Sequence, residues 1–101
     1  MREAAGILEV FGCVAAFVAA DAAAKAANVR IESIDKNKPA NADSLPVPLI
    51  TCLKIRGSVA DVEAAMEAGA AAAEALTGVI TKHIIPAPAE DTEKMLRISA
   101  I

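Results

Sequence analysis

The stretch LKIRGSVADVEAAMEAGAAAAEALTG, residues 53–78, decides the fold class, because it joins the end of a strand to a long amphipathic helix. Gly57 ends the strand, Ser58 stands at the N-cap position, and Asp61 follows three residues later, which approximates a capping box. Apolar residues then recur at alternating steps of three and four as far as Gly78, so one helix face is predicted to pack on a sheet. That face consists of Val59, Val62, Met66, Gly69, Ala73 and Leu76.

Further strand and helix patterns lie on both sides of this stretch. The run after Gly12 is almost wholly helix-favouring, with Val14, Phe17 and Val18 at helical spacing and alanines on the remaining faces. The predicted strands are 4–11, 29–35, 49–56 and 79–85, the predicted helices are 13–28, 59–77 and 90–98, and a polar, proline-containing loop covers 36–48.

The order of these elements is β-α-β-β-α-β followed by a tail helix. This order predicts an α+β fold of the ferredoxin-like, split βαβ type with a short C-terminal helix. At 101 residues the chain is long enough for one compact domain and too short for two, so residues 1–101 are expected to form a single domain. The topology hosts many functions, so it does not identify an activity.

Alanine dominates the composition. Apolar residues make up 55% of the chain, but aromatic residues only 2%, and there is no Trp. Alanines let backbones approach closely, yet each buries little apolar area, which contributes about 25 cal/mol per Å². A small domain of this kind gains much from oligomerisation, so we expect assembly with other copies.

Charge and hydropathy argue against several classes of protein. The net charge is −3 and the ten basic residues are scattered, so nucleic acid is not expected as a partner. No uncharged apolar window is long enough for a membrane span, so no membrane partner is expected. The N-terminus lacks the pattern of an export signal, which favours the cytoplasm.

Few residues carry potential chemistry. Cys13 and Cys52 have neither CxxC spacing nor a His-rich neighbourhood, so they are interpreted as buried or half-buried free thiols, and no metal site or cofactor is predicted. His83 alternates with strand residues, which is typical of a structural or interfacial histidine. No Gly-x-Ser-x-Gly turn or Gly-rich phosphate loop occurs, so no catalytic residue is predicted.

Four segments together point to one family. They are GILEVFG (6–12), AADAAAKAANV (19–29), IRGSVADVEAAMEAGAAAAEAL (55–76) and KHIIPAP (82–88). In sequence and spacing they resemble the single-domain, hexameric BMC shell proteins of bacterial microcompartments. With the matching order of elements, the resemblance covers nearly the whole chain.

The resemblance implies a structural protein rather than an enzyme. In this family six copies form a flat tile, tiles join edge to edge into a shell facet, and loops between the second and third strands line a central pore. Lys25 and Asn28 match the lysine and asparagine of the tile edge, and Pro86, Ala87 and Pro88 match its edge turn. Ala87 stands where the family usually has an arginine, so weaker tiling or a minor shell role is expected.

The loop over 36–48 is longer than the short Gly/Ser-containing turn common in the family, so its lining is not carried over residue by residue. Six-fold symmetry would make one side chain at the axis into a ring of six. Some relatives hold an iron–sulfur cluster through cysteines in this loop, but this loop has none, so no such cluster is expected. A plain surface loop is the alternative. The side chains expected at the opening are among Lys36, Asn37, Lys38, Asn41, Asp43 and Ser44.

Two other functions stay open at this level. A ferredoxin-like oligomeric regulatory protein would bind a small metabolite at subunit interfaces and would form no extended sheets. A small enzyme subunit would lose turnover on His83→Ala. The shell interpretation instead predicts a bacterial microcompartment in the cytoplasm, with other copies, other shell proteins and encapsulated enzymes as partners and small polar metabolites crossing the pore.

Overall fold

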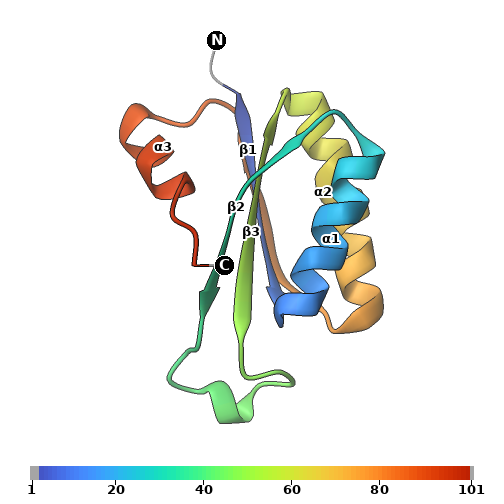
Figure 1. Ribbon diagram of the computed structural model, residues 1–101, viewed down its shortest axis with the longest axis vertical. Coiled ribbons are helices and arrows are strands. Elements are labelled where there is room, and N and C mark those ends of the chain that lie inside the picture. The colour runs from blue at the N-terminus through green and yellow to red at the C-terminus, as the bar shows by residue number, and fades with distance from the viewer. Residues whose placement is uncertain (1–2, 101) are drawn as a thin grey trace.

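The computed structural model describes residues 3–100. Two helices cover one face of a four-stranded sheet, and a third helix lies on the other face (Figure 1). The elements are β1 (Ala4–Phe11), α1 (Cys13–Ala26), β2 (Arg30–Asn37), the 3₁₀ turn η1 (Ala42–Ser44), β3 (Ile50–Gly57), α2 (Val59–Leu76), β4 (Val79–Ile85) and α3 (Glu90–Leu96).

The sheet has the strand order β2-β3-β1-β4, and all its pairings are antiparallel. β1 and β3 are therefore central, while β2 and β4 are the two edge strands. α1 packs over β1, β2 and β3, whereas α2 packs mainly over β1 and β4. This arrangement confirms the predicted ferredoxin-like α+β fold with a short C-terminal helix.

Several predicted boundaries are shifted by one or two residues, and two of these shifts change the description of the surfaces discussed below. α1 ends at Ala26 rather than at residue 28, because the backbone of Ala27 is already extended. β2 continues to Asn37, because its last two residues still pair with β3. The connection between β2 and β3 therefore runs over 38–49, so Lys36 and Asn37 belong to the end of a strand rather than to the predicted loop.

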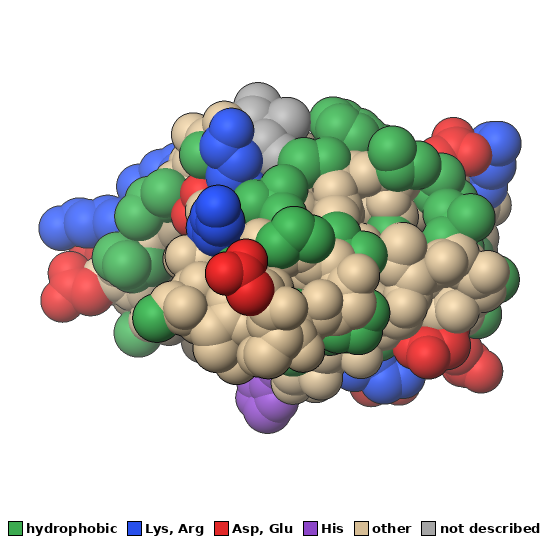
Figure 2. Space-filling view, turned by 90° about the horizontal axis from the view of Figure 1, so that it is seen from below, with side chains coloured by type: hydrophobic (Ala, Val, Ile, Leu, Met, Phe, Trp, Pro, Cys, Tyr) green, Lys and Arg blue, Asp and Glu red, His purple; other side chains and the backbone are tan. Residues whose placement is uncertain are grey.

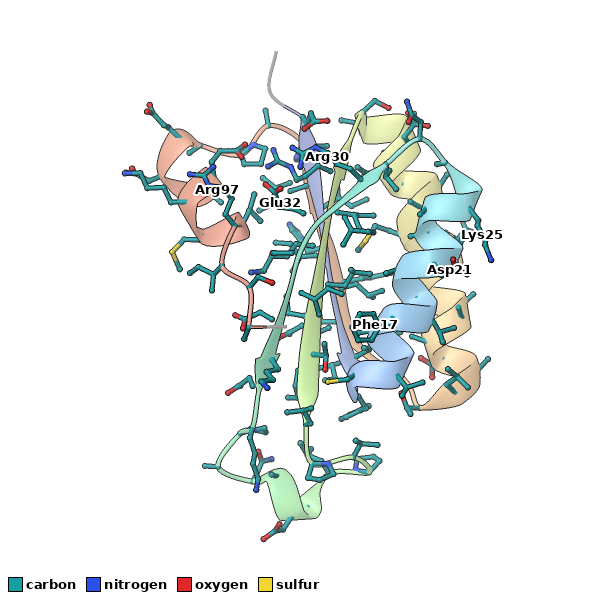
Figure 3. The ribbon with its side chains drawn as sticks, in the orientation of Figure 1. Phe17, Asp21, Lys25, Arg30, Glu32 and Arg97 are labelled. Atoms are coloured by element: carbon teal, nitrogen blue, oxygen red, sulfur yellow. The ribbon has the colours of Figure 1, made fainter. Side chains whose placement is uncertain are left out.

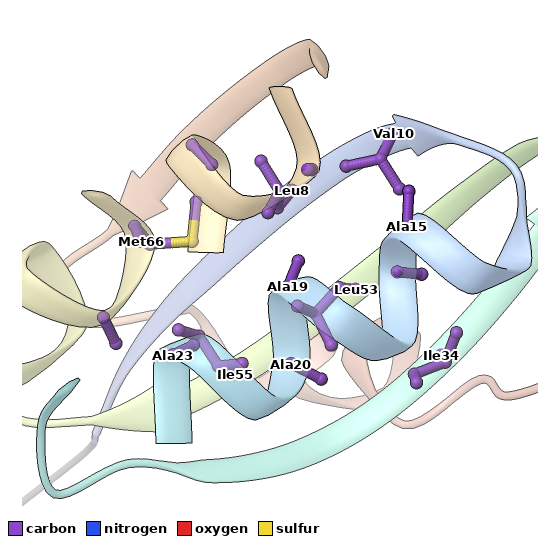
Figure 4. Close-up of a cluster of buried hydrophobic side chains, with 14 of the residues drawn as sticks. Leu8, Val10, Ala15, Ala19, Ala20, Ala23, Ile34, Leu53, Ile55 and Met66 are labelled. Atoms are coloured by element: carbon purple, nitrogen blue, oxygen red, sulfur yellow. The ribbon is translucent and has the colours of Figure 1, made fainter. Parts of the chain in front are cut away.

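Small side chains set the spacing between the two large helices and the sheet. A Cβ atom added at Gly69 of α2 would lie 3.1 Å from the carbonyl oxygen of Ala19 in α1, so the two helices nearly touch at this point. Leu8 and Val10 of β1 and Leu53 of β3 fill the space beneath them (Figure 4). The buried side of α1 consists of Ala15, Ala16, Ala19, Ala20 and Ala23.

α2 follows its predicted pattern closely. The Ser58 hydroxyl accepts a hydrogen bond from the Asp61 backbone N–H at 3.1 Å, which confirms the N-cap. Val59 and Leu76 are 42% and 55% exposed, contrary to the predicted stripe, because they are the first and last residues of the helix. The other four members of the stripe, Val62, Met66, Gly69 and Ala73, are buried.

Candidate assembly surfaces

The outward side of α1 carries large apolar side chains. Val14, Phe17 and Val18 are 71%, 52% and 39% exposed, because alanines occupy the side that packs on the body. Ile31 of the neighbouring edge strand β2 is also exposed. Figure 2 shows apolar side chains gathered on the α1 side of the molecule. We call these four residues the α1/β2 flank; contiguous apolar surface of this kind marks interaction sites.

The opposite side of the molecule, formed by α2 and β4, is also incompletely covered. Leu76 and Ile80 are exposed there, and among the described residues the outer edge of β4 pairs with no further strand. A cleft of about 430 Å³ lies between the two elements. It is lined by Glu63, Met66, Glu67, Lys82, His83 and Ile84. We call this side the α2/β4 flank.

His83 projects into solvent on this second flank (Figure 2). Its position in β4 is opposite Ile7 of β1. Within residues 3–100, no three His, Cys, Asp or Glu side chains come close enough together to hold a metal ion.

Lys25 and Asn28 lie at the end of α1, and both are exposed. The Lys25 ammonium is 2.7 Å from the Asp21 carboxylate one turn earlier, and both side chains point away from the sheet (Figure 3). Such an exposed pair contributes only about 0.3–0.5 kcal/mol, so it holds Lys25 weakly. The Asn28 carbonyl lies against Gly57, where an added Cβ would be 3.1 Å away.

The turn between β4 and α3 contains the three other residues predicted for the tile edge. Pro86 and Ala87 are exposed, whereas Pro88 is buried. Because β4 runs antiparallel to β1, this turn lies near the start of β1, at the end of the molecule where α1 also finishes (Figure 1). The 38–49 connection lies at the opposite end.

The 38–49 connection is held by its own hydrogen bonds. The Leu45 N–H donates to the Ala42 carbonyl at 3.1 Å, and the Ser44 hydroxyl donates to the Asn41 carbonyl at 2.8 Å. Asp43 belongs to η1. All six residues predicted for the pore are exposed: Lys36, Asn37, Lys38, Asn41, Asp43 and Ser44.

Neither cysteine forms a disulfide within the described part of the chain, and both are half-buried, as predicted. Cys13 lies at the start of α1, where its sulfur is 3.8 Å from the Thr51 hydroxyl. Cys52 lies on the α3 side of the sheet, and burial raises the pKa of its thiol. A thiol that holds its proton in this way is a weak nucleophile at neutral pH.

A buried charged cluster on the α3 side of the sheet was not anticipated from the sequence. The Arg56 side chain is 3% exposed and its guanidinium binds the Glu93 carboxylate through two hydrogen bonds of 2.6 and 2.7 Å. These bonds are the main reason that the pKa of Arg56 is raised. The sequence signal was the alternation of Cys52, Lys54 and Arg56 in β3, which gives that strand one polar face.

The profile of the BMC domain matches residues 4–88. The chain belongs to the BMC domain family. The profile therefore covers both helices of the body and all four strands, and it ends immediately before α3.

Individual relatives agree with this assignment. The microcompartment shell protein PduA of Citrobacter freundii is 41% identical over 94% of this chain and 92% of its own length. The shell protein EutM of Salmonella typhimurium is 37% identical over 96% of this chain and 92% of its own length. The carboxysome shell protein CcmK3 of Halothece is 38% identical over 98% of this chain and 90% of its own length.

A solved microcompartment protein from Desulfitobacterium hafniense has the same fold, with a TM-score of 0.71 and 25% sequence identity. The match covers this whole chain and half of that protein. Within residues 3–100 no helix is long and apolar enough to cross a bilayer. On the family match and these relatives, the chain is a structural shell protein of bacterial microcompartments rather than an enzyme, as the sequence predicted.

Proposed function

We propose that the chain forms a cyclic homohexamer that serves as a tile in a shell facet and has a central pore for small polar metabolites. The observation that carries the ring is the outward direction of Val14, Phe17 and Val18. If the α1/β2 flank of one copy packs on the α2/β4 flank of the next, both incompletely covered sides are buried. Because these two flanks differ, the contact is head-to-tail, and repetition about a rotation axis closes a ring.

The long shape of the molecule supports this geometry. Its principal extents are 42, 28 and 19 Å, and the 38–49 connection and the end of α1 lie at opposite ends of the longest axis. In a ring joined through the two flanks, one end lies near the axis and the other at the periphery. The proposal assigns the connection to the pore and Lys25, Asn28 and the 86–88 turn to the tile edge.

Positively and negatively charged side chains at the 38–49 connection favour polar solutes in the proposed pore. Each copy has Lys36 and Lys38 at its start and Asp43 in η1, all exposed. Six-fold symmetry would repeat each of these charges six times around the opening. A mixed ring of this kind suits small polar metabolites better than apolar ones.

Contacts between tiles would depend on Lys25. Two-fold axes between neighbouring tiles use each edge residue twice, so a weak contact repeats across the facet. Ala87 supplies no side-chain hydrogen-bond donor at the edge, which leaves Lys25 as the main cation of the contact. We therefore propose weak self-tiling, or a place among other shell proteins, in a shell that surrounds enzymes.

The test combines the solution mass of the purified protein with electron microscopy of the same sample. We expect a six-subunit mass and sheets or tubes that Lys25→Ala abolishes without dissociating the hexamer. Lys94→Ala is the matched control, because Lys94 on α3 is equally exposed and paired with Asp91. A monomer or trimer would reject the tile and favour the regulatory alternative, which also predicts stabilisation by a metabolite.

A further inference from the structure

α3 is held to the rest of the molecule by few contacts, and most of them are polar. It has seven residues, far fewer than an isolated helix needs for stability in water. Leu96 is the only residue within α3 that is buried. The helix therefore exists because of the surface on which it lies, and that surface is made chiefly of β3 and β2.

The first anchor is the pair of Arg56 and Glu93. All the guanidinium nitrogens of Arg56 donate hydrogen bonds: Nε to the Ala4 carbonyl at 3.2 Å, Nη2 to the Glu3 carbonyl at 2.9 Å, and both Nη atoms to Glu93. A weaker contact of 3.4 Å reaches Glu32 of β2. Of these partners, only Glu93 belongs to α3, so it alone ties the helix to the buried cation.

The second anchor consists of side chains of β2 and β3 that donate hydrogen bonds to the carbonyls at the C-terminal end of α3. The buried Ser33 hydroxyl donates to the Leu96 carbonyl at 2.6 Å. The buried Lys54 ammonium donates to the Ile98 carbonyl at 2.8 Å and lies 3.4 Å from the Met95 carbonyl. A cation at this position complements both the unpaired carbonyls and the negative end of the helix.

The residues after α3 continue along the free edge of β2. The Ala100 N–H donates to the Ile34 carbonyl at 3.1 Å, and the Ser99 hydroxyl donates to the same carbonyl at 2.9 Å. β2 is an edge strand, so this tail covers backbone groups that would otherwise be open to another strand. Residues 88–100 thus span from the end of β4 across the sheet to its opposite edge.

We propose that residues 88–100 form a latch over the face of the sheet on which α3 lies. The latch opens, meaning that α3 and the tail leave this face, when the bond between Arg56 and Glu93 is lost. The body of β1 to β4 with α1 and α2 has its own core on the other face, so it stays folded when the latch opens. Opening exposes Ser33, Lys54 and Arg56, a strip of hydrogen-bond donors, together with the edge of β2. The proposal does not depend on ring formation.

Acid is one condition that opens the latch. Protonation of Glu93 would remove the negative charge that compensates the buried guanidinium of Arg56. The other charged groups at this place are Glu32 and Arg30 of β2, Glu3 before β1, and Lys54 of β3. Glu32 and Glu3 belong to the body rather than to α3, so neither of them ties the helix to Arg56.

The test is amide hydrogen exchange of the full-length protein, measured by mass spectrometry on peptides from 90–100 and from α2. Glu93→Gln keeps the shape of the side chain and removes its charge. We expect it to speed exchange in 90–100 at pH 7 about tenfold or more, as the loss of charge-assisted bonds implies, and to leave α2 unchanged.

Glu90→Gln is the matched control, because Glu90 lies in the same first turn of α3 and is exposed. It should leave exchange in 90–100 at the wild-type rate. Wild-type protection of 90–100 in Glu93→Gln would overturn the latch. Equal loss of protection in α2 would also overturn it, because α3 would then be part of the cooperative core rather than a separate cover.

Discussion

Phe17→Ala tests the proposed ring most directly, and the structure sets its expected size. Phe17 is 52% exposed in the single chain, so roughly 100 Å² of a side chain of about 200 Å² is available for burial against the next copy. At about 25 cal/mol per Å², this burial contributes about 2.5 kcal/mol to each subunit contact. Its loss should weaken each contact by about 70-fold.

The assay is native mass spectrometry or light scattering over a series of protein concentrations. The wild-type protein should remain hexameric to much lower concentration than Phe17→Ala. Circular dichroism must show that the variant is folded, because the buried half of the Phe17 side chain also stabilises the single chain. Met95→Ala is the control: Met95 is 62% exposed on α3, away from both flanks, and should not alter dissociation. Unchanged dissociation of Phe17→Ala would refute the contact.

Three further predictions address the edge, the core and the thiol. Ala87→Arg should give larger and more ordered sheets in electron micrographs, and unchanged sheets would remove Ala87 as the cause of weak tiling. Gly6→Ala should lower the free energy of unfolding in urea by about 1–3 kcal/mol, because its Cβ would lie 2.7 Å from the Met66 sulfur; an unchanged midpoint would contradict this packing. Alkylation of Cys52 should require a higher pH in the folded chain than in the urea-unfolded chain, because burial raises the pKa of its thiol. Coincident pH profiles of the alkylation rate in the two states would exclude that effect. The folded state then binds the thiol proton more tightly, so stability should fall as the pH rises above about 8.5, and Cys52→Ser should lack this dependence.

Much of the fold was predictable because its signals are local. Gly57, Ser58 and Asp61 mark the passage from β3 into α2 by turn and capping chemistry that needs no distant partner. Alternation and prolines likewise locate the strands. The end of β2 was misjudged by two residues, because only pairing with β3 keeps its polar last residues in a strand.

The candidate sites were less predictable, because they depend on which side of an element meets which neighbour. The sequence places Val14, Phe17 and Val18 at helical spacing, but it does not say that the alanine side is the buried one. That choice follows from the close approach of α1 and α2 at Gly69, which large side chains would prevent. The pair of Arg56 and Glu93 spans 37 residues, so no local pattern reveals it.

The orientation of α1, with its alanines buried and its large apolar side chains exposed, gives a physical reason for the proposed assembly of copies. A helix that turns its alanines inward gains close packing against α2, but it contributes little apolar burial to the single chain. The larger burial lies in Val14, Phe17 and Val18, which the single chain leaves exposed. In the proposed ring, folding of the subunit and contact between subunits therefore depend on opposite sides of the same helix. Consequently, substitutions on the outer side should affect assembly more than folding, whereas enlarging an inner alanine should prevent both.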